Sequence, residues 1–286
     1  MTLTRCLALV GLLGAFGCAG APEDADTETG TDEGALEAVG ADRDDDVAHT
    51  AWTTLGTGVS YKSVGDGTSA LLVYGGYSAQ DIYSQRWAQE LFREKREALS
   101  LGHIYAIRGP NQSGYANREI QNSRIAAHLA AGRAAAARSI VIVAHSSGTF
   151  VSAELLGMMQ AGRAGPASET LGKTSIFHLD GGGTGSRQTL SQMAGAFFVY
   201  ACDSNLGQCS KNSSSMKWLG QTYASFGGAI KLDATGSGCN SGGLWCLHDT
   251  LITTKPHNPN MYDLRRDYTH FEGSRKVVTA YLDRVP

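Results

Sequence analysis

Short apolar runs alternate with longer stretches in which apolar residues recur at helical spacing over most of the chain after residue 58. The apolar runs that predict strands are 69–74, 103–107, 139–144, 175–179, 195–201 and 229–232. The stretches that predict helices are 81–99, 119–137, 147–160 and 274–284. Strands that are apolar throughout are typical of a sheet buried on both faces. The pattern therefore predicts an α/β domain with a mostly parallel central sheet and helices on both faces.

One further segment, 59–64, alternates between apolar and polar residues and is followed by Gly65-Asp66-Gly67. Glycine and aspartate favour tight turns, so we expect this segment to pair with the strand at 69–74.

The residues that directly follow the apolar runs are the candidates for chemistry, because ligands of such sheets bind beyond the carboxyl ends of the strands. These residues are Gly75-Gly76-Tyr77, Arg108, His145-Ser146, Asp180 with Gly181-Gly182-Gly183, Asp203, and the loop after Leu232.

Residues 1–18 have the layout of a secretory signal peptide. Arg5 supplies a charged start, and residues 7–16 are apolar or glycine. The ending Ala15-Phe16-Gly17-Cys18 resembles a bacterial lipobox, although a Leu-like residue is usual where Ala15 stands. We therefore expect export, either as a cell-envelope lipoprotein lipidated on Cys18 or as a secreted protein after plain cleavage.

Residues 19–46 contain eleven acidic residues and one basic residue. Such a segment cannot bury enough apolar surface to fold, which predicts a disordered tether over 19–50 and a single domain over 51–286. The remainder, 47–286, carries 22 basic and 16 acidic residues. No dense basic stripe with interleaved aromatic residues accompanies this excess, so nucleic acid is not expected as a partner. Membrane contact is expected only through a lipid on Cys18.

Four cysteines remain after Cys6 and Cys18, and they fall into two close pairs. Cys202 and Cys209 enclose six residues, as do Cys239 and Cys246. Two local disulfides are the simplest of the three possible pairings and fit an oxidising compartment. The C-x-x-C spacing of zinc sites is absent, so we expect neither a metal nor an organic cofactor.

The strongest chemical signal is Ala144-His145-Ser146-Ser147-Gly148, which lies between a predicted strand and a predicted helix. Small residues two positions before and after Ser146 permit a sharp turn that raises the serine hydroxyl above the sheet. The following helix then directs its N-terminus at a charge developing near Ser146. Ser146 is the candidate nucleophile, while His145 is expected to aim away from it.

This run resembles the A-H-S-x-G elbow of bacterial lipases, and residues 55–284 resemble the α/β-hydrolase superfamily. The resemblance implies a triad in the order serine, acid, histidine, with the acid after the second strand beyond the elbow. Asp203 holds that position and is the expected acid. Asp180, after the first strand, is the alternative acid, although it also suits a turn into the three glycines that follow it.

The histidine remains open among His248, His270 and His257, which all follow the last apolar run. His248 is favoured because the Cys239–Cys246 disulfide would hold it rigidly. His270 precedes the final predicted helix, as many histidines of the superfamily do. Resemblance also implies an oxyanion hole formed by the backbone N–H groups of Ser147 and Tyr77, with Gly76 as the alternative to Tyr77.

Together these features predict a serine hydrolase that cleaves ester-like acyl bonds of a small-molecule or lipid ester through a Ser-His-Asp triad and a covalent acyl-enzyme. Peptidase, amidase or acyltransferase activity on the same triad is an alternative. A catalytically silent ligand-binding lipoprotein with the same fold is another, because fold alone does not fix function.

Overall fold

The computed structural model describes residues 51–110, 114–131, 136–210, 227–239, 244–252 and 277–286, all within one compact unit. The expected signal peptide with Cys18, the expected tether, His257 and His270 lie outside the described residues.

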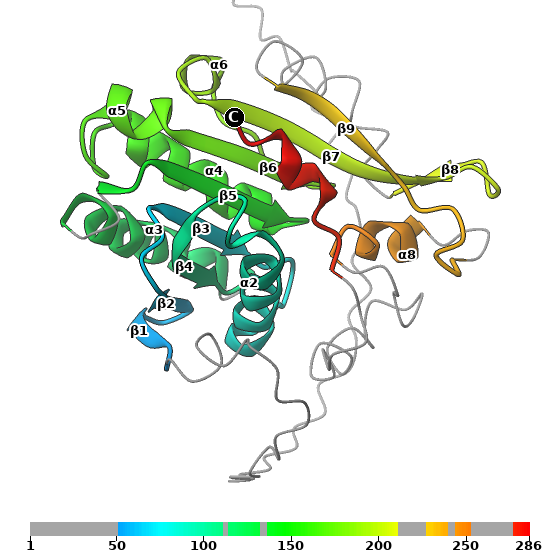
Figure 1. The fold of residues 1–286 in the computed structure, drawn as a ribbon, viewed down its shortest axis with the longest axis horizontal. Helices are drawn as coiled ribbons and strands as arrows, with labels where there is room; N and C mark the ends of the chain where they lie inside the picture. Colours follow the sequence, from blue (N-terminus) through cyan, green and yellow to red (C-terminus); the bar gives the residue numbers. More distant parts are fainter. Residues whose placement is uncertain (1–50, 111–113, 132–135, 211–226, 240–243, 253–276) are drawn as a thin grey trace, which may run out of the picture. The chain divides into compact units, whose positions relative to one another are not determined.

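A nine-stranded sheet runs through the described part of the chain in the order β1-β2-β4-β3-β5-β6-β7-β8, with β9 also paired to β7 (Figure 1). The strands are β1 Thr53–Gly56, β2 Val59–Ser63, β3 Ser69–Tyr74, β4 Leu101–Ile107, β5 Ser139–His145, β6 Thr174–Leu179, β7 Gly195–Asp203, β8 Gln208–Cys209 and β9 Gly227–Asp233.

The sheet is mixed, so the expectation of a mostly parallel sheet is confirmed only for its central strands. Strands β4, β3, β5, β6, β7 and β9 pair in parallel, whereas β1 with β2, β2 with β4, and β7 with β8 are antiparallel. The predicted pairing of 59–64 with 69–74 is wrong, since β2 pairs with β4 instead, Val59 opposite Ile107. A local turn pattern cannot reveal that β4, from later in the chain, occupies the neighbouring place.

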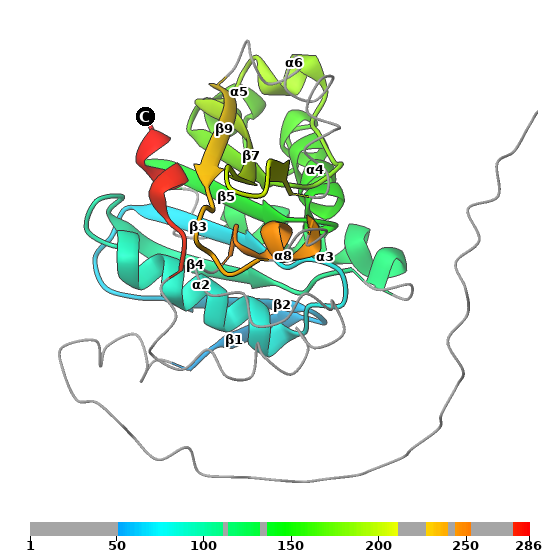
Figure 2. The same ribbon diagram turned by 90° about the vertical axis from the view of Figure 1, so that its right-hand side faces the viewer.

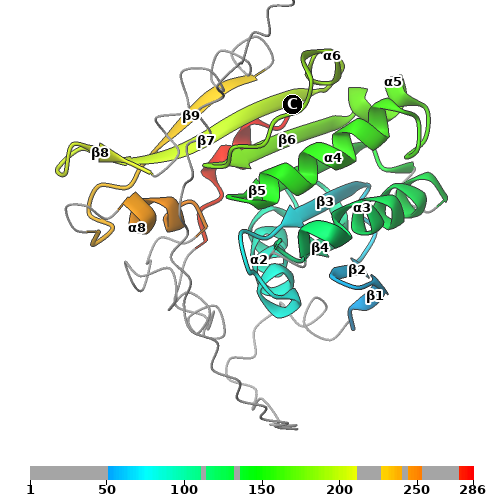
Figure 3. The same ribbon diagram turned by 180° about the vertical axis from the view of Figure 1, so that it is seen from behind.

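Helices cover both faces of the sheet, as Figures 1 and 3 show from opposite sides. Those with residues in the core of one face are α3 Gly114–Ala131, α4 Gly148–Gln160 and the short α5 Ala167–Gly172 and α6 Arg187–Leu190. The other face is covered by α2 Asp81–Lys95, α8 Leu244–Asp249 and the 3₁₀ helix η4 Ala280–Arg284. The predicted final helix is shorter than expected, because residues 277–279 are not helical.

Alternate residues of β5 explain why the central runs are apolar throughout. Ile140, Ile142 and Ala144 pack into the core beneath α3 and α4. Val141 and Val143 pack into the opposite core beneath α2. Burying both faces fixes the register of β5, since a slip by one residue would exchange its two sets of side chains. The sheet is therefore a rigid support for whatever follows its carboxyl ends.

Figure 2 shows α8 lying at the edge that the strand ends form. Within the described ranges, no helix combines the length and the apolar character that crossing a membrane requires.

Candidate active site

Ser146 stands at the turn between β5 and α4 in a left-handed backbone conformation, with φ of 54°. This conformation is unfavourable for a residue with a Cβ and costs on the order of 1–3 kcal/mol, so the surrounding structure must impose it. The Ser146 N–H donates a hydrogen bond to the Leu179 carbonyl at 2.9 Å, which ties the turn to the end of β6. The half-buried serine thus has the strained strand-to-helix geometry of a nucleophile elbow.

Gly148 is where the elbow passes closest to the neighbouring strand. A Cβ on Gly148 would lie 2.4 Å from the Gly75 carbonyl oxygen and 2.8 Å from that of Tyr74. Both are backbone atoms in the central sheet or directly after it, so neither can move cheaply. The requirement for a small residue two positions after Ser146 is therefore a matter of direct backbone contact.

His248 and Asp180 form a buried pair at the same edge of the sheet. His248 Nδ1 lies 2.5 Å from Asp180 Oδ2, with side-chain exposures of 3% and 0%. When the neutral imidazole donates its Nδ1 proton to this carboxylate, Nε2 is left free to accept a proton. Among the described residues, no hydrogen bond joins Ser146 Oγ to His248. Contacts of this kind often tighten only when substrate is bound.

Asp180, like Ser146, has a left-handed backbone, with φ of 45°. Its N–H donates to the Val199 carbonyl at 2.8 Å. The next residue, Gly181, permits close packing, because a Cβ there would lie 2.4 Å from the Ser146 carbonyl oxygen. The glycines after Asp180 therefore let the loop that carries Asp180 pack against the turn at Ser146.

Thr149 links these two loops from the first turn of α4. Its Oγ1 donates to the Ser146 carbonyl at 2.7 Å and accepts from the Gly183 N–H at 2.9 Å. One hydroxyl thus connects the peptide of the candidate nucleophile to the loop that carries Asp180.

The structure does not pair Asp203 with His248. Asp203 Oδ1 instead accepts from the backbone N–H groups of Asn205 and Leu206, at 2.8 and 3.1 Å, and stabilises the turn between β7 and β8. Within the described residues no hydrogen bond joins Asp203 to His248. The structure therefore places Asp180, and not the expected Asp203, against the imidazole of His248. His270 falls outside the described residues, so the structure offers no comparison of it with His248.

The Gly75-Gly76-Tyr77 loop lies next to the elbow. A Cβ on Gly76 would lie 3.3 Å from Ser146 Cβ. In the part of the chain that the structure describes, the backbone N–H groups of Tyr77 and Ser147 donate to no other residue. An oxyanion hole requires two backbone N–H groups that are free to bind the substrate oxygen. The N–H groups of Tyr77 and Ser147 therefore remain its predicted donors.

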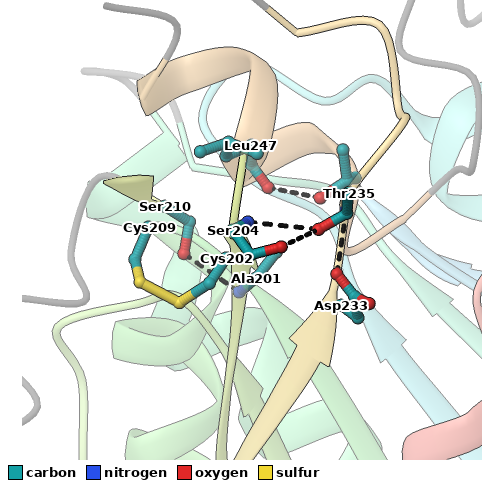
Figure 4. The surroundings of a disulfide bond; sticks show 9 residues. Ala201, Cys202, Ser204, Cys209, Ser210, Asp233, Thr235 and Leu247 are labelled. Carbon is teal, nitrogen blue, oxygen red and sulfur yellow. Dashed lines mark hydrogen bonds between the residues drawn. A yellow bond between two sulfur atoms is a disulfide. The ribbon is translucent and has the colours of Figure 1, made fainter. Parts of the chain in front are cut away.

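Both disulfides that the sequence predicted are present, Cys202–Cys209 and Cys239–Cys246. The first closes the β7–β8 hairpin, and Figure 4 shows Thr235, from the loop after β9, bonded to Ser204 within it. The second joins that later loop to α8 through Cys246, two residues before His248. Together they attach the helix that carries His248 to the end of the sheet.

Two further buried ionisable groups belong to the elements that carry His248 and Asp180, Asp249 at the end of α8 and His178 in β6. Burial first, and the Asp180 carboxylate second, raise the pKa of Asp249 well above its ordinary value and favour its neutral form. Burial lowers the pKa of His178 to about 3. His178 Nε2 lies 3.1 Å from Ser152 Oγ of α4, so it supports the elbow helix from β6. Perturbed groups gathered in one place are typical of functional sites.

Sequence reasoning missed His145. It was expected only to aim away from the serine, and no contact was assigned to it; its buried ring lies beside that of His248, with 4.3 Å between centroids. Its position next to Ser146 was the only sequence feature that could have indicated a role for His145. Its contact with α8 could not be predicted, because α8 lies about a hundred residues later in the chain. No cluster of His, Cys, Asp and Glu that could hold a metal ion occurs among the described residues.

No protein-family model and no curated protein matches the chain. Two solved structures resemble it distantly. A lipase-esterase related protein from Clostridium acetobutylicum is 14% identical, with a TM-score of 0.28 over 44% of this chain and 48% of that one. A dienelactone hydrolase-like promiscuous phosphotriesterase from metagenomic libraries is 12% identical, with a TM-score of 0.38 over 65% of this chain and 80% of that one. The chain thus spans about half the length of the first. At these values neither structure bears on the chemistry of the site.

Proposed function

We propose that the chain is a serine hydrolase that cleaves ester-like acyl bonds, with Ser146 as nucleophile, His248 as base and Asp180 as the acid that orients it. One observation carries the proposal. The left-handed Ser146 on the β5–α4 turn shares a sheet edge with a buried His248–Asp180 pair at 2.5 Å, although the three residues come from separate parts of the chain.

In the proposed reaction, His248 Nε2 takes the hydroxyl proton as Ser146 Oγ attacks the ester carbonyl carbon. The carbonyl electron pair moves to oxygen, where the Tyr77 and Ser147 N–H groups stabilise the negative charge. Collapse of this intermediate breaks the bond to the alcohol, which leaves with the proton from His248. Water then attacks the acyl-enzyme with His248 again as base, releasing the carboxylic acid and restoring Ser146. Asp180 holds His248 in the required tautomer throughout.

Export belongs to the same proposal. Two disulfides in a domain of this size favour an oxidising compartment, which agrees with the signal-like N-terminus. The short-range pairing of both disulfides suits folding after export, because each closes within its own loop.

A fluorophosphonate probe tests the proposal, because it phosphonylates an activated serine and leaves an ordinary serine hydroxyl essentially unreacted. The wild-type chain is expected to be labelled, and Ser146→Ala should abolish labelling. Ser147→Ala is the matched control and should keep it, since only the Ser147 backbone N–H is given a role. Unlabelled wild type would contradict the proposal and favour a silent binder. Turnover of p-nitrophenyl butyrate against the matched anilide then separates esterase from amidase activity.

A further inference from the structure

We propose that His145 is a positioning residue that holds the backbone of His248 at a fixed place beside the nucleophile, with a single water molecule fixing the tautomer of its imidazole. This inference rests on the proposed function and adds a residue to its machinery.

The contact that carries the inference joins His145 to the main chain of the base. His145 Nε2 lies 3.2 Å from the His248 carbonyl oxygen, and both residues are buried. A carbonyl only accepts, so Nε2 must carry the proton. The two imidazole rings also contact each other, tilted by 40°.

His145 is suited to this task by its place in the chain. It is the last residue of β5 and directly precedes Ser146, whose backbone is fixed by the sheet. Asp180 fixes the direction of the His248 ring through Nδ1. The position of the His248 ring also depends on the position of α8. The His145 contact fixes α8 relative to the backbone next to Ser146. A displacement of about 1 Å between reacting groups can lower the rate roughly a hundredfold.

The other ring nitrogen of His145 faces a small cavity. The cavity has a volume of about 10 Å³ and is lined by Gly75, Gly76, Ala79, Tyr83, Ser84, Trp87 and His145. A Cβ on Gly76, in its wall, would lie 3.0 Å from His145 Nδ1. This volume admits one water molecule, which needs two to four polar partners.

Two candidate partners belong to residues that line the cavity. Ser84 Oγ and Trp87 Nε1 are buried without a hydrogen-bond partner among the described residues. A water there accepts the Trp87 Nε1 proton, bonds the Ser84 hydroxyl and donates to His145 Nδ1. That last bond requires a bare Nδ1, which leaves the proton on Nε2 for the His248 carbonyl.

The charge of His145 agrees with this arrangement. Burial first, and the neighbouring His248 second, lower the pKa of His145 well below its ordinary value. His145 therefore stays neutral, and it does not repel His248 when that ring becomes an imidazolium during turnover.

The test compares His145→Phe, which keeps a ring but removes the donor, with His145→Gln, whose side-chain amide can still donate to the carbonyl. With p-nitrophenyl butyrate, the Phe variant should lose roughly 10- to 100-fold in kcat with KM within about twofold, whereas Gln should restore most of the loss. Thermal unfolding checks that both variants fold. Wild-type kcat in the Phe variant, or an equal loss in both, would overturn the inference.

Nitrogen NMR of the His145 ring tests the tautomer without any substrate. The expected spectrum has a protonated Nε2 and a bare Nδ1, and Trp87→Phe, which removes one partner of the water, should weaken that preference. A protonated Nδ1 in the wild type would refute the inference. The proposed function is judged separately, by fluorophosphonate labelling of Ser146, so the two can fail independently.

Discussion

Two residues with left-handed backbones, Ser146 and Asp180, follow adjacent parallel strands of the sheet. Neither is glycine, so each conformation costs free energy that packing must offset. Both N–H groups bond to the neighbouring strand, Ser146 to Leu179 and Asp180 to Val199. The same kind of strained turn thus presents the hydroxyl and the carboxylate, and at the residue scale this repetition favours Asp180 as the acid.

Asp180→Asn and Asp203→Asn separate the two candidate acids. A neutral amide in place of the Asp180 carboxylate cannot hold the protonated Nδ1 of His248 in the same way, so kcat should fall by roughly a thousandfold or more. Asp203→Asn should leave kcat within about threefold of wild type, because an amide oxygen can also accept from the turn N–H groups. Both are measured with p-nitrophenyl butyrate on folded protein. A large loss in the Asp203 variant alone would return the acid to that residue.

The expected pairing of Asp203 with His248 is absent for a reason that no local pattern reveals. Periodicity correctly located the turn between β5 and α4 and the strand ends, and cysteine spacing the two disulfides, because both are local properties. Which carboxylate meets the imidazole depends instead on where α8 rests, and that is a long-range packing outcome. The turn-forming role considered for Asp180 belongs to Asp203.

At the scale of elements, α4 and the glycine loop after β6 fit closely around Thr149. A Cβ on Gly181 would lie 2.2 Å from Thr149 Oγ1 and 2.4 Å from the Ser146 carbonyl oxygen. The glycines are therefore needed so that the loop after β6 can approach α4 closely. From the sequence they indicated only a turn.

Gly181→Ala should consequently lower stability by about 1–3 kcal/mol, because the added methyl group forces the loop away from α4. It should also lower kcat, since Asp180 moves with the loop. Gly157→Ala is the matched control within α4, where an added Cβ meets nothing within 4 Å. That exposed helical position should gain about 0.5–1 kcal/mol. Urea unfolding measures both, and equal stabilities would show that the loop is not tightly packed.

At the scale of the whole molecule, buried histidines make stability depend on pH. The folded pKa of His178 is lowered by burial to about 3, against an ordinary value of 6.5. As pH falls, the unfolded chain takes up this proton first. The stability contribution of a neutral His178 is therefore fully present above about pH 6.5 and is lost progressively towards pH 3. His145, whose pKa burial also lowers, acts in the same direction.

Between pH 7 and pH 5, His178 alone should lower the free energy of unfolding by about 2 kcal/mol. The reason is that pH 5 lies roughly 1.5 units below the unfolded pKa, and each unit is worth about 1.4 kcal/mol. His178→Asn removes this titration, so the stability difference between the two pH values should shrink by about that amount. Stability at neutral pH should also fall, because the contact with Ser152 is changed. The measurement is urea unfolding with intact disulfides.

His128→Asn provides the comparison, because His128 is partly exposed and its ring bonds the Tyr105 hydroxyl at 2.7 Å. Solvent screens this site, so its replacement should change the pH dependence less than that of His178. The raised pKa of Asp249 means that its contribution to stability grows as pH falls, which opposes the loss at the histidines. Asp249 is present in both variants, so this contribution cancels when each is compared with wild type. If His178→Asn keeps the full wild-type loss between the two pH values, the buried neutral imidazole is not the cause of acid sensitivity, and His145 becomes the group to replace next.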